Sequence, residues 1–128
     1  MNAHVKPYMF AAAAVAITLL LGACDSQPAA TSGAALFKKK CSTCHSLEPG
    51  IHKVGPSLAG IMGREAGSTD FPKYRALKDA GFIWDQDKIA AWISDPKKFM
   101  GKPTAMTVKI KNEKDRHAII KYLSGNHD

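Results

Sequence analysis

Apolar residues recur at the three- and four-residue spacing of helices in several stretches of the chain. No stretch of useful length alternates apolar and polar residues as a strand does. Between residues 33 and 45, Leu36, Phe37, Cys41 and Cys44 fall at helical spacing, and three lysines fill the positions between them. This pattern predicts an amphipathic helix over residues 33–45.

Two further helices are predicted from the residues at their ends. Residues 72–80 begin with proline and are followed by Gly81, an arrangement typical of a short helix. Asp85 can cap a helix that carries Ile89, Trp92 and Ile93, and Pro96 should stop that helix.

The last predicted helix follows Asn112, which can cap it. Ile119 and Leu123 lie one turn apart in it, and Gly125 stands beyond its end. Residues 46–71 show little regular pattern. The predicted fold class is therefore all-α, with a few short helices and long loops.

The first 23 residues resemble a signal peptide. A charge-free apolar run, residues 9–23, follows Lys6 and is shorter than the roughly 18 to 20 residues of a spanning helix. The run ends in Leu-Gly-Ala-Cys24, which resembles the lipobox of bacterial lipoproteins. We therefore expect residues 1–23 to be removed, Cys24 to be lipidated, and the protein to lie at the periplasmic face of the bacterial inner membrane. Ordinary signal cleavage giving a soluble periplasmic protein, and an uncleaved anchor, are the alternatives.

Residues 24–32 are polar and small, which predicts a flexible tether before a domain over residues 33–128. After the leader the chain keeps 17 basic and 11 acidic residues. A basic surface fits nucleic acid, anionic lipid or an acidic protein, and charge alone does not choose among them. Export argues against nucleic acid.

The strongest motif is Cys41-Ser-Thr-Cys44-His45, the CxxCH signature of covalent haem attachment. Cysteines three apart on a helix share a face, so both sulfurs can reach one porphyrin edge. The adjoining His45 can then bind the iron as the first axial ligand.

Two other sites use a CxxC pair. A thioredoxin-like site should follow a buried strand, and no such strand is predicted here. A structural zinc site needs a second pair of ligands, and neither a later cysteine nor a suitable histidine pair is present.

From Gly33 to Leu123 the chain resembles the class I cytochromes c. The matching stretches are GAALFKKKCSTCH, HKVGPSLAGIMGREAG, GFIW, DPKKFM, TAM and IIKYL. The resemblance implies a cytochrome c fold wrapped around one covalent haem c. It also implies that Gly33, Phe37, Ile119 and Tyr122 form the contact between the first and last helices.

In this family the second axial ligand is a methionine about sixty residues after the histidine, with a threonine two positions before it. Met106 and Thr104 fit this arrangement. Met100 is the rival, because the loop appears one residue longer than usual. A histidine and methionine pair fills both axial positions of the iron, which suits electron transfer.

Other positions take their roles from the resemblance. Pro56 matches the proline whose carbonyl orients the axial histidine, and Arg64 and Trp84 match residues that bind the haem propionates. The family's propionate-binding tyrosine aligns with Lys73, and whether Tyr74 replaces it is open. Trp92 stands where the family often has a tyrosine near the methionine sulfur.

These features predict a single-electron carrier, not an enzyme. Lys40, Lys53, Lys97 and Lys98 match positions around the exposed haem edge and could steer the protein to acidic surfaces on an oxidase, a reductase or a bc1-type complex. A haem peroxidase or a gas-binding sensor is the alternative if the methionine is absent from the iron. A module docked permanently in a larger assembly is a third possibility.

Overall fold

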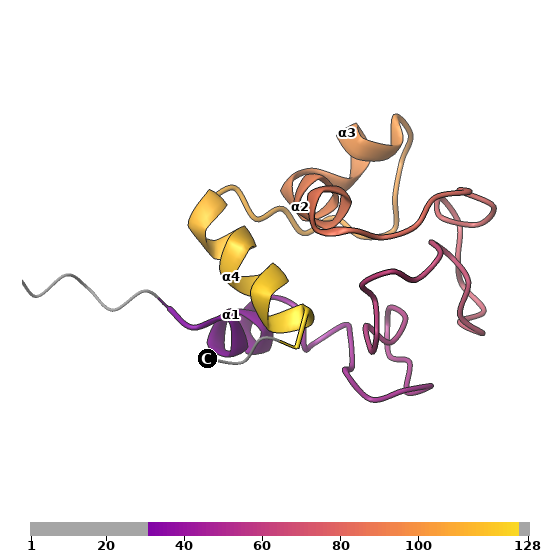
Figure 1. The fold of residues 1–128 in the computed structure, drawn as a ribbon. Helices are drawn as coiled ribbons and strands as arrows, with labels where there is room; N and C mark the ends of the chain where they lie inside the picture. Colours follow the sequence, from indigo (N-terminus) through magenta and orange to yellow (C-terminus); the bar gives the residue numbers. More distant parts are fainter. Residues whose placement is uncertain (1–30, 126–128) are drawn as a thin grey trace, which may run out of the picture.

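Four short helices and long loops make up the computed structural model, which describes residues 31–125 (Figure 1). The helices are α1 (Gly33–Lys40), α2 (Gln86–Ser94), α3 (Pro96–Met100) and α4 (Glu113–Leu123). Within the described residues no strand forms, and one isolated bridge joins Glu65 to Ile83. The all-α prediction is confirmed.

The predicted leader, Cys24 and most of the predicted tether lie outside the described residues. Within residues 31–125, no helix is long and apolar enough to cross a membrane.

Helices α1 and α4 cross closely, as Figure 1 shows. A Cβ placed on Gly33 would lie 2.2 Å from the carbonyl oxygen of Ala118, so only glycine allows this approach. The rings of Phe37 and Tyr122 lie 5.6 Å apart between centroids, and Ile119 is buried with 1% of its surface exposed. The predicted contact between the first and last helices is confirmed.

The predicted caps of the helix after Asp85 and of the helix after Asn112 are also confirmed. The Asp85 carboxylate accepts a hydrogen bond from the backbone N–H of Lys88 at the start of α2. The Asn112 side chain accepts one from the N–H of Asp115 at the start of α4. Each cap satisfies an amide that has no partner within its own helix.

Pro96 ends α2, as predicted, but it also begins a helix that was not predicted from the sequence. Asp95 is both the C-cap residue of α2 and the N-cap residue of α3. As the N-cap of α3, its side chain accepts a hydrogen bond from the backbone N–H of Lys98. Proline is favoured in the first turn of a helix because its missing N–H is not needed there. The sequence Asp-Pro therefore both stops one helix and starts the next.

The predicted first helix is shorter than expected. It ends at Lys40, and residues 41–44 form turns in which the carbonyl of Cys41 accepts from the N–H groups of Cys44 and His45. The reason is local: the Ser42 hydroxyl donates to the Lys38 carbonyl at 2.6 Å, and the Ser42 N–H bonds Phe37 instead. This side-chain bond competes for the Lys38 carbonyl, which would accept from the Ser42 N–H if the helix continued.

The prediction of a helix over residues 72–80 is wrong. This segment forms separate turns, closed by bonds from Lys78 N–H to Arg75 and from Ala80 N–H to Leu77, and Asp79 has a positive φ of 57°. A segment this short is not a stable helix by itself, so tertiary contacts decide its shape. One such contact lies at Gly67, where a Cβ would meet the carbonyl oxygen of Leu77 at 2.3 Å.

The core lies between the helices and the inner side of the loops. Most of its buried members form one cluster: Leu36, Ile61, Ala66, Trp84, Ile89, Ile93, Ile110, Ile119 and Ile120. Cys41 and Met106 both pack against it while remaining partly exposed. The tertiary structure thus gathers sulfur atoms from two distant parts of the chain around one apolar cluster.

Candidate functional site

The His45 ring is held in one orientation and one tautomer. Its Nδ1 lies 2.7 Å from the carbonyl oxygen of Pro56. A carbonyl only accepts, so Nδ1 carries the proton and Nε2 keeps its lone pair. Burial lowers the pKa of His45, and the Pro56 hydrogen bond opposes this in part. A neutral imidazole with a free Nε2 is suited to bind a metal.

The loop behind His45 approaches the ring so closely that position 55 must be glycine. A Cβ on Gly55 would lie 2.4 Å from Cε1 of His45. Gly55 is not among the glycines with positive φ, so steric contact, not backbone strain, sets this requirement. The N–H of Gly55 also donates to the Cys44 carbonyl at 2.8 Å, which joins the loop to the CxxCH turn.

Cys41 and Cys44 lie in the turn after α1 and form no disulfide within the described residues, and both are partly exposed. Burial, with a smaller contribution from Cys44, raises the pKa of Cys41 to about 11. Redox-active CxxC pairs need a thiol with a lowered pKa, because the thiolate is the nucleophile. This environment argues against a thioredoxin-like site.

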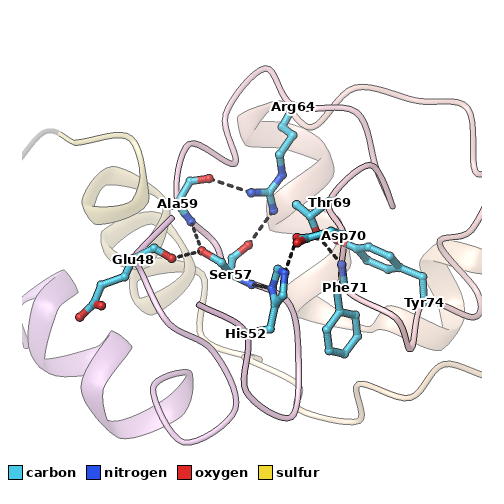
Figure 2. Close-up of polar contacts among 9 residues, drawn as sticks. All are labelled: Glu48, His52, Ser57, Ala59, Arg64, Thr69, Asp70, Phe71 and Tyr74. Atoms are coloured by element: carbon cyan, nitrogen blue, oxygen red, sulfur yellow. Dashed lines mark hydrogen bonds and ion pairs between the residues drawn. The ribbon is translucent and has the colours of Figure 1, made fainter. Parts of the chain in front are cut away.

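A hydrogen-bond network fixes the loop that carries Gly55 and Pro56 (Figure 2). His52 bonds on both sides of its ring: Nδ1 accepts from the Ser57 N–H at 2.9 Å, and Nε2 lies 2.7 Å from Asp70. The Ser57 hydroxyl donates to the Glu48 carbonyl at 2.6 Å. The hydrogen bond to His52 lowers the pKa of Asp70. No role for His52 was predicted from the sequence, although the residue begins the HKVGPS stretch that resembles the family.

Arg64 and Trp84 lie side by side although twenty residues separate them. The backbone N–H of Trp84 donates to the Arg64 carbonyl at 2.9 Å. This bond belongs to a short backbone pairing in which the N–H of Ala66 also donates to the Phe82 carbonyl. The Arg64 guanidinium donates to the carbonyls of Ser57 and Ala59 at 2.9 and 2.7 Å (Figure 2).

The surroundings of these two residues differ: Arg64 is partly buried among loop carbonyls, whereas Trp84 lies among aromatic rings. Burial lowers the pKa of Arg64, and the nearby Tyr74 opposes that shift. Trp84 is 4% exposed and stacks on Phe99. The Tyr74 hydroxyl lies 2.8 Å from the hydroxyl of Thr69 (Figure 2).

Met106 lies in the segment between α3 and α4, and its sulfur accepts a hydrogen bond. The indole Nε1 of Trp92 donates to Sδ at 3.1 Å, and the Thr104 hydroxyl donates to the Met106 carbonyl at 2.8 Å. Met100, the rival ligand, is the last residue of α3. Trp92 thus supplies an N–H where the resemblance leads one to expect a tyrosine hydroxyl.

The donor set of the described residues matches a covalently held haem. Two thiols stand three residues apart, a neutral imidazole adjoins them, and a thioether packs on the same core cluster. Within residues 31–125, no three side chains of His, Cys, Asp or Glu are grouped so as to hold a metal ion.

The four lysines predicted around the haem edge are all exposed. Lys53 lies close to the CxxCH turn, where its Nζ donates to the Ser42 carbonyl at 2.7 Å. Lys97 and Lys98 belong to α3, and Lys40 ends α1. Val54, next to Lys53, is 73% exposed.

Comparisons with known proteins agree with this geometry. A family model described as cytochrome c matches residues 30–126. Cytochrome c of Theileria annulata is 37% identical over 92 residues, covering 71% of this chain and 80% of its own. Cytochrome c2 of Rhodopseudomonas palustris is 35% identical over 112 residues, covering 74% of this chain and 96% of its own. Because the match spans the CxxCH turn, the Met106 segment and the helices that hold them, the chain belongs to the cytochrome c family and is an electron carrier with one covalently bound haem c.

Proposed function

We propose that this electron carrier holds the iron of its haem between Nε2 of His45 and Sδ of Met106, with the haem attached through Cys41 and Cys44. The observation that carries the proposal is the placement of Met106, whose sulfur is held by Trp92 while its side chain packs on the same core cluster as Cys41. With both axial positions filled, the iron exchanges electrons and has no site for a substrate.

Pro56, Arg64, Trp84 and Thr104 complete the proposed surroundings of the haem. Pro56 orients the His45 ring, and Thr104 braces the backbone of Met106. A guanidinium has five N–H groups, so the two bonds that fix the plane of Arg64 leave donors for a propionate. A positive group at that place would offset the cost of burying a carboxylate.

Replacing Met106 with alanine tests the axial ligand. The oxidised wild-type protein should show the weak near-infrared band of sulfur-ligated iron, and Met106→Ala should lose it. The reduced variant should bind carbon monoxide, which the wild type should not. The matched control is Met100→Ala, which should keep the band. If the wild type itself binds carbon monoxide, the iron is open, and a peroxidase or a gas-binding sensor becomes the better assignment.

We also propose that redox partners are recognised through Lys40, Lys53, Lys97 and Lys98. All four are exposed, and basic groups around an electron-transfer edge speed encounter with an acidic surface without requiring tight binding. The partners would be acidic surfaces on an oxidase, a reductase or a bc1-type complex.

Reversing two of these charges should slow electron transfer at low salt. In Lys97→Glu with Lys98→Glu, we expect the second-order rate with a purified bc1-type complex to fall by about tenfold, and the loss to shrink at high ionic strength. The control pair, Lys73→Glu with Lys78→Glu, changes the net charge equally at other exposed positions. Equal slowing by both pairs would mean that only net charge matters.

The leader completes the proposal. Residues 1–23 would direct export, lipidated Cys24 would hold the protein at the periplasmic face of the inner membrane, and residues 24–32 would tether the domain over residues 33–128. Its support is the charge-free run that ends at Cys24. We expect the wild-type protein to remain in the membrane fraction and the Cys24→Ser variant to be released from it. Retention of that variant would favour an uncleaved anchor, and release of the wild type would favour a soluble periplasmic protein.

A further inference from the structure

The segment that carries Met106 joins α3 to α4 and contains no helix or strand of its own. After α3 it runs back along α2 before α4 begins (Figure 1). None of its residues forms a backbone–backbone hydrogen bond with another residue of the segment, so its position depends on side-chain bonds and on bonds to neighbouring elements. The residues that hold it therefore decide how firmly Met106 is presented.

Beyond Met106 the segment is fastened to the α2–α3 junction at two successive residues. Nζ of Lys109 lies 2.7 Å from Oδ2 of Asp95. The N–H of the next residue, Ile110, donates to the Ile93 carbonyl at 2.7 Å. Met106 itself bonds the indole of Trp92, which lies on the same helix as Ile93. Thr104 therefore holds the segment before Met106 in the chain, and the Asp95–Lys109 ion pair holds it after Met106.

Asp95 uses its two carboxylate oxygens for two different purposes. Oδ1 accepts from the Lys98 N–H and caps α3, whereas Oδ2 pairs with Lys109. The hydrogen bond from Lys109 lowers the pKa of Asp95, so the carboxylate is ionised at neutral pH. The side chains of Asp95 and Lys109 are 30% and 45% exposed, which makes the pair sensitive to salt.

We propose that Asp95 is a positioning residue for Met106: through Lys109 it keeps the segment against the α2–α3 junction and so limits how often the methionine leaves the iron. This inference rests on the proposed assignment of Met106 as the axial ligand. Asp95 does not touch the sulfur and acts only through the backbone that Lys109 anchors.

The chain contains a matched control in Asp85. Its carboxylate caps α2 by accepting from the Lys88 N–H, and it also forms an ion pair with a lysine. That lysine is Lys88, three residues away, so the pair does not reach the Met106 segment. Asparagine is as good a helix cap as aspartate, so Asp→Asn at either position removes the ion pair and keeps the cap.

The test measures how fast imidazole binds to the oxidised, haem-containing full chain when imidazole is saturating. Under that condition the rate reports departure of Met106. We expect Asp95→Asn to raise the rate about two- to five-fold at low salt, the range given by a partly exposed ion pair. The increase should be smaller in about 0.5 M salt, because salt at this concentration screens partly exposed ion pairs. Asp85→Asn should match the wild type.

A double variant tests whether Asp95 acts through Lys109. Lys109→Gln should raise the rate as much as Asp95→Asn, and the two together should add little to either alone. Full additivity, or equal rates in Asp95→Asn and Asp85→Asn, would overturn the inference. If the oxidised wild type lacks the near-infrared band of sulfur-ligated iron, Met106 is not the axial ligand. The proposed role of Asp95 then fails as well. If the band is present but Asp95→Asn binds imidazole at the wild-type rate, Met106 remains the ligand and only the proposed role of Asp95 fails.

Discussion

Replacing Cys41 and Cys44 together with serine is expected to leave the protein largely unfolded, with most of the helical signal lost from its far-ultraviolet circular dichroism spectrum. The four helices contain 8, 9, 5 and 11 residues. Isolated helices shorter than roughly 12 to 15 residues are marginal in water. Within the described chain, residues 41–85 contain no helix, and their backbone hydrogen bonds belong to isolated turns, to loop contacts and to one short pairing.

The haem supplies the apolar mass that a chain of this size lacks. The control is Cys24→Ser, which removes a cysteine outside the attachment motif and should keep the haem absorption and the native circular dichroism. Native-like circular dichroism in a doubly substituted protein free of haem would show that the chain folds without its cofactor.

Gly55→Ala is expected to displace the His45 ring and to lower the free energy of unfolding by about 1 to 3 kcal/mol, the usual cost of overfilling a packed site. The added methyl carbon would lie 2.4 Å from the ring, and the nearest neighbours of this carbon are all His45 atoms. Either the ring or the loop must move, and the His45–Pro56 hydrogen bond should weaken. Unfolding by guanidinium and hydrogen exchange of the Nδ1 proton, observed by nuclear magnetic resonance, would measure the two effects.

The control for Gly55→Ala is Gly50→Ala in the same loop. Gly50 has a φ of 72°, and a Cβ there would have no heavy atom within 4 Å. Its substitution therefore introduces backbone strain, at a cost of roughly 1 to 2 kcal/mol, without contact with His45. We expect Gly50→Ala to lower stability but to leave exchange of the Nδ1 proton unchanged. Faster exchange in both variants would mean that general loosening of the loop, not contact with the ring, explains the result.

Helix caps could be predicted because they depend on residues close together in the chain. Asp85 and Asn112 each bond an amide three residues ahead, so a polar residue before an apolar repeat is enough to place the start. The same rule could have found α3, since Asp95 and Pro96 are a cap and a first helical residue. The sequence-based prediction used Pro96 only as the end of the preceding helix.

The helix prediction for residues 72–80 is wrong because Pro72 and the following Gly81 are equally suited to turns. Contacts such as the approach of Leu77 to Gly67 decided between the two outcomes. The pairing that brings Arg64 beside Trp84 also lacks a local signal, because it forms only when the chain reverses between them. The resemblance named both residues as haem neighbours, but it did not show that they contact each other.

The sequence by itself determined the CxxCH motif, the helix caps at Asp85 and Asn112, and the family, because these depend on near neighbours or on motifs in a fixed order. Only the tertiary structure decided that Trp92 donates to Met106, that His52 joins Asp70, and that Asp95 fastens Lys109. These contacts join residues 14 or 18 positions apart. Their formation depends on how the intervening chain packs against the common core, and no local pattern specifies that packing.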